Sequence, residues 1–261
     1  MSFSDDEVER YARHLVLREI GGPGQQRLKA ARVLVVGAGG LGAPAALYLA
    51  AAGVGELTLV DPDTVALSNL QRQVLYATGD EGRVKVEAAA ARLAALNPNT
   101  RLTPVAEYLN EANARALVAG HDLVLDGTDD FASRFAVNAA CVAEGMTLVS
   151  GAIGRWTGQV GVFAGRPCYR CFVPEIPPDA ETCAAVGVVG ALAGVVGSMM
   201  ALEAIKLLTD AGDPLTGRLL IYDALAAETR TVRIGADPEC TVCSLPFMAR
   251  DRPRSGQGGG V

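Results

Sequence analysis

The chain has 261 residues, of which 50% are hydrophobic and 20% charged, and its formal net charge is -6. This composition is that of a globular protein with a substantial core, and an acidic chain without long Lys/Arg runs is a poor general binder of nucleic acid. The N-terminal stretch MSFSDDEVERYARHL starts with acidic residues and is unlike a signal peptide. We therefore expect a cytoplasmic protein without a nucleic-acid partner. In that reducing compartment, six cysteines favour metal or redox chemistry over disulfides.

Strands and helices alternate in the predicted secondary structure between residues 32 and 151. The predicted strands are Arg32–Val36, Glu56–Val60, Arg101–Ala106, Asp122–Asp126 and Thr147–Gly151. The predicted helices are Ala43–Ala52, Gly82–Leu96, Glu111–Val118 and Phe131–Ala143. This order predicts an α/β fold with a Rossmann-like, doubly wound and mostly parallel sheet that is covered by helices on both faces.

The pattern changes after Gly151. The segments RWTGQVGVFAG and GRLLIYDALAAETRTVRI are typical of hairpin strands, and the second places a short turn between Leu219–Tyr222 and Thr229–Ile234. We therefore expect the sheet to continue into a smaller, mixed or antiparallel C-terminal part. The proline-rich segment VPEIPPDAE lies between the hairpins, and the final RDRPRSGQGGGV has the composition of a flexible tail.

The uncharged segment Ala184–Leu202 is long enough to cross a membrane. It is rich in Gly and Ala, however, and Glu203 and Lys206 follow it directly. These features favour a buried core helix, and we expect no membrane association.

A glycine-rich turn follows the first predicted strand. Gly37, Gly39 and Gly42 fit the pattern G-x-G-x-x-G, with Gly40 as an additional glycine, and Asp61 ends the second strand. Such a turn brings the backbone close to phosphates at a helix N-terminus, and the acidic residue bonds ribose hydroxyls. The pattern predicts a nucleotide site without requiring NAD; the alternative is a tight turn that only packs the helix on the sheet.

Further polar residues are expected at the same edge of the sheet. The segment DPDTVALSNLQRQVLY offers Asn69, Arg72 and Gln73, Lys85 lies near the start of the next helix, and Asp129 follows a strand. Cations and a carboxylate around a phosphate site suit phosphoryl or nucleotidyl transfer. Each residue also has a structural alternative: a solvated helix residue for Lys85, a surface ion pair for Arg72, and a helix N-cap for Asp129.

The cysteines form two C-x-x-C pairs, Cys168/Cys171 and Cys240/Cys243. The four thiolates could hold one tetrahedral Zn2+, although the 68 residues between the pairs exceed the common zinc-ribbon spacing. The alternative is two buried or redox-active pairs. Cys141 is expected to lie on a helix and to be buried in the protein core. Cys183 precedes the apolar segment, where a helix N-terminus would lower the pKa of its thiol.

Taken together, these motifs resemble the MoeB/ThiF/HesA family of bacterial ubiquitin-activating-type adenylyltransferases. The resemblance covers nearly the whole chain, in family order from Arg10 to Cys243, and SNLQRQ joined to the glycine turn is its most specific part. The segments that carry it are RYARHLVLREIG, VLVVGAGGLGAPAALYLAAAGVGELTLVDPDTVALSNLQRQVLY, KVEAAAARLAALNP, DLVLDGTDD, GQVGVF, PCYRC, TC and CTVC.

The resemblance implies an ATP-dependent enzyme that is typically a homodimer. Its substrate would be a ubiquitin-like sulfur-carrier protein of the MoaD/ThiS type that ends in Gly-Gly. The carrier's C-terminal carboxylate would attack the α-phosphate of ATP, giving an acyl-adenylate and pyrophosphate before sulfur transfer. Because no rhodanese domain follows Cys243, the sulfur is expected from a separate donor protein.

The resemblance also implies roles for single residues. Asp61 would hold the ribose, Asp129 would serve Mg2+, and Arg13 would reach into the partner's active site. Where the family often has TDN, this chain has Asp129-Asp130, which leaves the role of Asp130 open. The expected catalytic residues are Arg13, Arg72, Lys85, Asp129 and Cys183. The expected nucleotide contacts are Gly37, Gly39, Gly40, Gly42, Asp61, Asp63, Ser68, Asn69, Leu70, Gln71, Arg72, Gln73, Lys85, Asp129 and Asp130.

The resemblance also implies that the four paired cysteines form a structural zinc site. The family cysteine that matches Cys183 forms a covalent link to the carrier in some members and is dispensable in others. The chain would divide into an N-terminal helical segment (1–30), an ATP-binding part (31–151), a carrier-binding and zinc part (152–247) and a tail (248–261), within one integrated domain.

Two other classes of protein remain as alternatives. An NAD(P)-dependent oxidoreductase would need a proton donor near the hydride, and neither of the two histidines, His14 and His121, follows a predicted strand. A non-enzymatic, zinc-stabilised scaffold is the other alternative.

Overall fold

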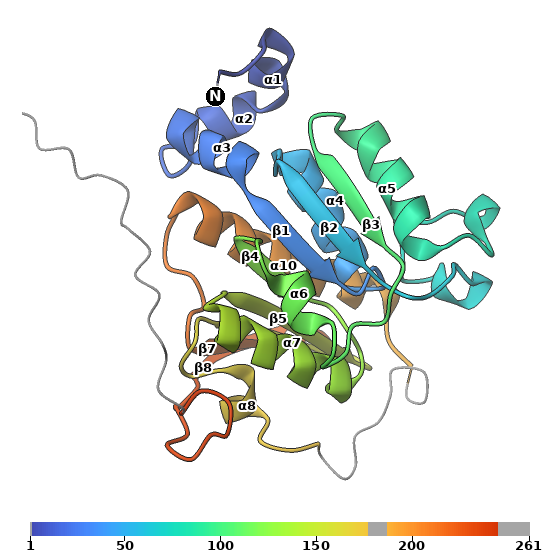
Figure 1. Cartoon of the computed structure of the whole chain (residues 1–261). Helices are drawn as coiled ribbons and strands as arrows, with labels where there is room; N and C mark the ends of the chain where they lie inside the picture. Colours follow the sequence, from blue (N-terminus) through green and yellow to red (C-terminus); the bar gives the residue numbers. More distant parts are fainter. Residues whose placement is uncertain (1, 177–186, 245–261) are drawn as a thin grey trace, which may run out of the picture.

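The computed structural model describes residues 2–176 and 187–244 (Figure 1). In this part of the chain, eight strands form one sheet in the order β3-β2-β1-β4-β5-β6-β7-β8. The strands are β1 (Arg32–Val36), β2 (Glu56–Val60), β3 (Arg101–Val105), β4 (Leu123–Asp126), β5 (Leu148–Gly154), β6 (Thr157–Phe163), β7 (Arg218–Asp223) and β8 (Glu228–Arg233). The first five strands are parallel and β5 to β8 are antiparallel, which confirms the predicted fold class.

Helices cover both faces of the sheet, as predicted (Figure 1). The helices are α1 (Asp5–Arg10), α2 (Ala12–Leu15), α3 (Gly21–Ala30), α4 (Gly42–Ala52), α5 (Lys85–Leu96), α6 (Ala114–Val118), α7 (Phe131–Glu144), α8 (Tyr169–Phe172) and α10 (Gly190–Thr209), with short 3-10 turns η1 (Leu67–Asn69) and η2 (Thr78–Asp80). Val33 and Val35 of β1 join the core under α4, α5 and α10, whereas Leu34 and Val36 join the core under α6 and α7. Both faces of this central strand are therefore buried.

Two predicted helices begin too early. Helix α5 begins at Lys85 instead of Gly82, because Gly82 has a positive φ of 82° and Val84 is extended and bridges to Thr64. Helix α6 begins at Ala114 instead of Glu111, because the preceding residues form a polar turn.

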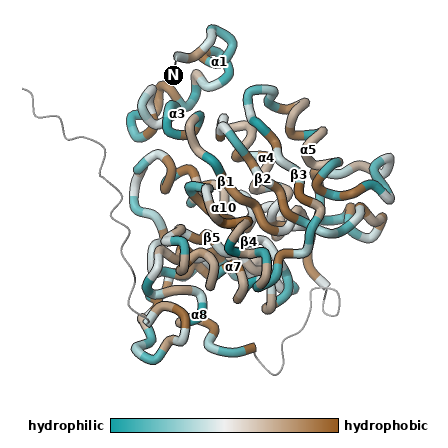
Figure 2. The backbone as a smooth tube through the Cα atoms, in the orientation of Figure 1, coloured by the Kyte–Doolittle hydropathy of each residue, from teal (hydrophilic) through white to brown (hydrophobic). Residues whose placement is uncertain are grey.

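The apolar segment forms α10, which begins at Gly190 and continues to Thr209. Glu203 does not end the helix, because its carboxylate accepts the N–H of Leu215 and pairs with Lys206. Among the described residues α10 is the one helix long and apolar enough to cross a membrane, but it packs on α3, α4, β5 and β6. Figure 2 shows hydrophobic residues concentrated on α10 and the central strands, as expected of a core helix.

The N-terminal helices pack at the amino ends of the strands. The ring of Tyr11 lies directly over Gly53, which precedes β2. Its hydroxyl accepts a hydrogen bond of 2.8 Å from Asn97, which precedes β3. Helices α1 and α2 are thereby fixed at the end of the sheet opposite to the carboxyl ends of the strands.

The glycine turn allows α4 to approach β1 closely. A Cβ atom on Gly42 would lie 1.7 Å from the carbonyl oxygen of Gly37. No rotamer change can relieve this contact, because both partners are backbone. A glycine at position 42 is therefore required by the packing of the helix on the strand.

Gly42→Ala should lower the free energy of unfolding by about 3 kcal/mol, since overpacking against backbone forces α4 away from the sheet. The matched control is Gly194→Ala in α10, where nothing lies within 4 Å of the added Cβ. This control should leave the protein as stable or stabilise it by up to about 1 kcal/mol. Urea denaturation of both variants measures the difference, and equal stabilities would contradict the packing argument.

Candidate active site and metal centre

A pocket of about 540 Å³ lies at the carboxyl ends of β1, β2 and β4. Strand β1 lies between β2 and β4 in the sheet. The chain therefore leaves β1 toward one face of the sheet and leaves β4 toward the other. Open α/β sheets bind ligands in the crevice at such a point. Eleven of the predicted nucleotide contacts line it: Gly37, Gly39, Gly40, Asp61, Asp63, Asn69, Arg72, Gln73, Lys85, Asp129 and Asp130.

Lys85 is buried in this pocket, so the alternative of a solvated helix residue is wrong. Its Nζ donates to Asp63 Oδ2 at 2.8 Å and lies 3.9 Å from Asp61 Oδ1. Asp61 also accepts the N–H groups of Ala38 and Asp63. Burial raises the pKa of Asp61, and the charge of Lys85 opposes this shift. The carboxylate is thus held rigidly at the end of β2, beside the glycine turn.

Arg72 and Gln73 pack against the glycine turn. A Cβ on Gly40 would lie 3.7 Å from the Arg72 side chain, and one on Gly39 would lie 3.4 Å from Gln73 Nε2. Arg72 donates to the carbonyl of Ser68 and forms no ion pair with any described residue, in contrast to the surface-pair alternative. Gln73 is buried, yet its Oε1 has no hydrogen-bond partner within residues 2–176 and 187–244. An unpaired buried amide oxygen is the kind of group that a bound ligand or water satisfies.

The two adjacent aspartates have different surroundings. Asp130 is the N-cap of α7: its Oδ1 accepts the N–H of Ser133 at 2.8 Å and the hydroxyl of Tyr108 at 3.1 Å. The N-cap alternative for Asp129 is therefore wrong. Asp129 lines the pocket, and its carboxylate makes no hydrogen bond to the described part of the chain, so its oxygens are available to a metal ion.

Other predicted contacts lie outside the pocket lining. Gly42 packs against Gly37, Ser68 contributes its carbonyl to Arg72, and Leu70 packs on the core. The Gln71 carbonyl lies against Gly190 at the start of α10.

Arg13, another predicted catalytic residue, does not line the pocket of its own chain. Arg13 is exposed on α2, at the opposite end of the sheet, and Cys183 lies outside the described residues.

Arg134, which was not among the predicted site residues, lines the pocket although its side chain is only 7% exposed. A signal was present, because positions 134, 137, 138 and 141 follow helical spacing and share the buried face of α7. Tyr108, Phe131, Tyr169 and Phe172, which were not predicted either, add aromatic side chains to the pocket lining.

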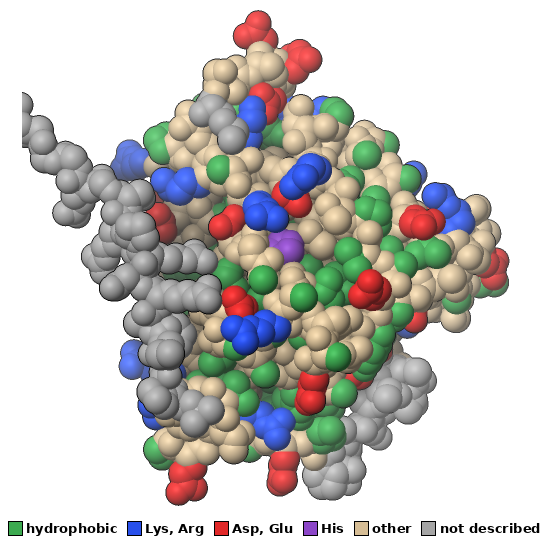
Figure 3. Space-filling model, in the orientation of Figure 1, with side chains coloured by type: hydrophobic (Ala, Val, Ile, Leu, Met, Phe, Trp, Pro, Cys, Tyr) green, Lys and Arg blue, Asp and Glu red, His purple; other side chains and the backbone are tan. Residues whose placement is uncertain are grey.

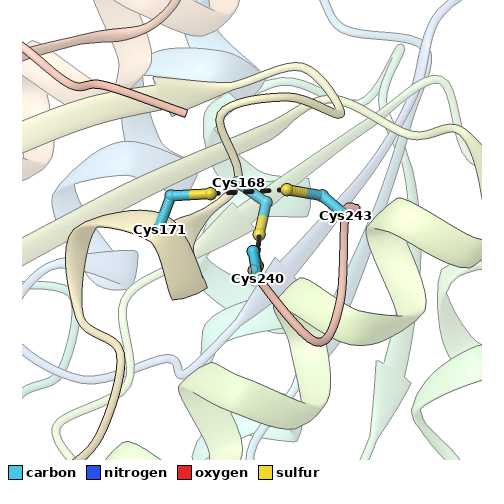
Figure 4. A group of neighbouring side chains, drawn as sticks. All are labelled: Cys168, Cys171, Cys240 and Cys243. Atoms are coloured by element: carbon cyan, nitrogen blue, oxygen red, sulfur yellow. Dashed lines mark hydrogen bonds between the residues drawn. The ribbon is translucent and has the colours of Figure 1, made fainter. Parts of the chain in front are cut away.

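The four paired cysteines form one cluster near α7 and α8 (Figure 4). All four sulfur atoms lie within 4.8 Å of one another, and two contacts join the two motifs: 3.7 Å for Cys168–Cys240 and 3.3 Å for Cys171–Cys243. Tetrahedral Zn–S bonds of about 2.3 Å place sulfur atoms about 3.8 Å apart. This donor set therefore fits a metal ion.

The surroundings of the cluster affect its thiols. Burial raises the pKa of Cys168, toward which Asn138 Nδ2 donates at 3.6 Å. At Cys240, burial acts in the same direction, but the N–H groups of Cys243 and Val242 outweigh it and lower the pKa to about 7. Cys141 is buried in the core, as predicted, and burial raises its pKa.

Neither histidine lines the pocket. His14 Nδ1 lies 3.0 Å from Gln25 Oε1, and His121 Nε2 lies 2.9 Å from Thr58 Oγ1. The oxidoreductase alternative therefore lacks a histidine as proton donor.

On the face shown in Figure 3, acidic and basic side chains are interspersed.

The chain is similar to known proteins over most of its length. The chain is 48% identical over 243 residues to the molybdopterin-synthase adenylyltransferase of Escherichia coli, covering 92% of this chain and 98% of that protein. It is 47% identical over 252 residues to the sulfur carrier protein adenylyltransferase of Thermus thermophilus, covering 93% of each, and 47% identical over 246 residues to the SAMP-activating enzyme E1 of Haloferax volcanii, covering 93% and 91%. The E. coli MccB structure matches with a TM-score of 0.80 at 23% identity, covering 93% of this chain and 73% of that one, which shows a shared fold. The ThiF family model matches residues 11–242, and the chain belongs to the ThiF family.

Proposed function

We propose that this protein adenylates the C-terminal glycine carboxylate of a ubiquitin-like sulfur-carrier protein of the MoaD/ThiS type. The observation that carries the proposal is the pocket itself, where Lys85, Arg72, Gln73 and Asp129 surround the glycine turn of a ThiF-family chain. Relatives that match over nearly their whole length are named adenylyltransferases of sulfur carriers.

The polar residues that line the pocket suit ATP. In this proposal Asp61 accepts the ribose hydroxyls, since the lone pairs not used by Ala38 and Asp63 remain available. The glycine turn and the N-terminus of α4 face the phosphates. Arg72 and Lys85 then lie along the triphosphate, with the amides of Asn69 and Gln73 beside them.

The proposed reaction is an attack of the carrier's carboxylate oxygen on the α-phosphorus of ATP. A new P–O bond gives the acyl-adenylate, and the bond to the β-phosphate oxygen breaks to release pyrophosphate. Negative charge grows on the non-bridging oxygens and on the leaving group, so fixed cations at Arg72 and Lys85 stabilise the transition state more than the ground state. Mg2+ held at Asp129 would neutralise further charge on the phosphates.

Loss of either cation should slow carrier-dependent ATP–pyrophosphate exchange. Arg72→Ala and Lys85→Ala should each reduce the rate about a hundred- to a thousandfold, the usual cost of removing a preorganised charge-stabilising group. The matched control is Arg83→Ala. Arg83 lies two residues before Lys85, and it forms an exposed ion pair with Asp80. Exchange should be measured with a cognate carrier ending in Gly-Gly; activity of Lys85→Ala equal to that of the control would reject the proposed site.

Sulfur transfer is proposed as a separate, later step that requires a separate donor protein. Within the described residues, Cys141 is buried in the core and the four other cysteines belong to the cluster, so none of them is available to carry sulfur. Cys183 is proposed to act only downstream of adenylation. Cys183→Ala should accordingly retain exchange and lose thiocarboxylate formation, which mass spectrometry of the carrier measures; loss of both would show that the two steps are not separate.

We further propose that the cysteine cluster binds one structural Zn2+. The sulfur–sulfur distances fit four-thiolate coordination, and a closed site of this kind adds directly to folding stability. The ion would fasten the segment around Cys240 to α8, which contains Cys171 and has Cys168 as its N-cap.

Purified protein should contain one zinc per chain by elemental analysis. Cys168→Ser and Cys240→Ser should lose the metal and melt at lower temperature, because the metal's binding energy contributes to folding. Cys141→Ala, which alters a cysteine outside the cluster, should retain the metal. Protein purified without chelator and free of zinc would contradict this assignment.

Finally, we propose that the enzyme is a homodimer in which Arg13 acts in the partner's pocket. Arg13 is exposed on α2, and the contacts of Tyr11 hold this helix away from the pocket of its own chain. A role for Arg13 in catalysis is therefore compatible only with a second chain.

Two inactive variants should complement each other if the pocket is shared between subunits. Mixing Arg13→Ala with Lys85→Ala should restore activity, since mixed dimers contain one pocket with both residues intact. Subunit exchange must be verified independently by labelled-subunit analysis. Verified mixed dimers without activity would show that Arg13 does not act across the interface.

A further inference from the structure

A buried ion pair lies directly beneath the proposed phosphate site. Asp126, at the end of β4, is 0% exposed, and its Oδ2 lies 4.0 Å from Nη1 of Arg134 in the first turns of α7. Desolvating two charges is costly, and well-packed apolar residues often stabilise a fold at least as well. The pair is therefore poorly explained by stability alone.

The side chains of Asp126 and Arg134 together bind three polar atoms of Thr128. Asp126 Oδ1 accepts the backbone N–H of Thr128 at 3.0 Å and its hydroxyl at 2.7 Å. Arg134 Nη2 donates to the carbonyl of Thr128 and, at 2.8 Å, to that of Gly151 in β5. Thr128 thus has its N–H, hydroxyl and carbonyl bound by one ion pair.

The connection that carries Thr128 is also confined from the other side. Gly37 has a positive φ of 84°, and a Cβ there would lie 3.1 Å from Gly127 and 3.2 Å from the nitrogen of Thr128. The peptide that joins Thr128 to Asp129 therefore starts from a fixed position between the glycine turn and the ion pair. Asp129, by contrast, makes no hydrogen bond of its own to the described residues.

We propose that Asp126 and Arg134 are positioning residues that act through Thr128 to aim the carboxylate of Asp129 at a phosphate-bound Mg2+. This inference rests on the proposed function, because it requires ATP and Mg2+ in the pocket. It assigns the pair no contact with substrate. Groups that orient a metal ligand in this way commonly change metal affinity about 10- to 100-fold when they are removed.

The test measures binding of a non-hydrolysable ATP analogue by calorimetry over a range of Mg2+ concentrations, without the carrier. The main variant is Arg134→Lys, which keeps the charge opposite Asp126 but cannot donate to both carbonyls as a guanidinium does. Arg115→Lys is the matched control, since Arg115 forms an exposed ion pair with Glu144 and neither residue lines the pocket. Thr128→Val, which removes only the hydroxyl contact, is a second variant that leaves the ion pair in place.

Arg134→Lys should raise the Mg2+ concentration for half-maximal enhancement of binding about tenfold, while Mg2+-free binding stays within about twofold of wild type. Thr128→Val should shift it in the same direction by less, and Arg115→Lys should not shift it. Asp129→Asn should produce at least as large a shift, and the double variant Asp129→Asn/Arg134→Lys should be no worse than Asp129→Asn alone, because both changes act through one carboxylate.

Additive effects in the double variant would overturn the inference, and so would a wild-type Mg2+ response in folded Arg134→Lys or Thr128→Val. The inference would also be overturned if Arg134→Lys weakened binding of the analogue as much without Mg2+ as with it. The ion pair would then affect the whole pocket and not the metal ligand alone. If the affinity of the wild-type protein for the analogue did not depend on Mg2+, the proposed metal role of Asp129 would be rejected together with this inference. The carrier is absent from the experiment, so failure of carrier adenylation leaves its outcome unaffected.

Discussion

The close approach of three backbone segments at the end of β1 is the constraint on which the pocket depends. Gly42 at the start of α4 lies against the carbonyl of Gly37, and Gly37 in turn lies against Gly127 after β4. No side chain separates these segments, so the N-terminus of α4 and the connection to α7 reach the same point. The cations and carboxylates of the pocket are arranged around that junction.

The fold was predictable where the hydrophobic pattern and the turn residues agree. Strands β1 and β2 have the bounds that the sequence predicts, because buried apolar runs end there at Gly37 and Asp61. The start of α5 was not predictable from local propensity. Val84 is held in an extended conformation by its bridge to Thr64, which is a contact between residues distant in the sequence.

Part of the predicted site does lie in one pocket, but the surroundings of its residues could not be predicted. Sequence motifs predict that Arg72, Lys85 and Asp129 lie together, yet only the structure shows that Lys85 is buried and that Asp130 caps α7. Arg134 was missed because an arginine on a helix usually extends into solvent. Its buried position depends on an acidic partner from another strand, and no local pattern around residue 134 indicates that partner.

The cysteine cluster joins two motifs whose members lie 72 residues apart in the chain. Every residue that lines the pocket precedes Val189, whereas the cluster requires Cys243. Because a ribosome synthesises the chain from its N-terminus, the residues of the pocket all emerge well before the last thiolate. All the described residues that line the pocket are therefore synthesised before Cys243, and the cluster cannot be complete until nearly the whole described chain has been made.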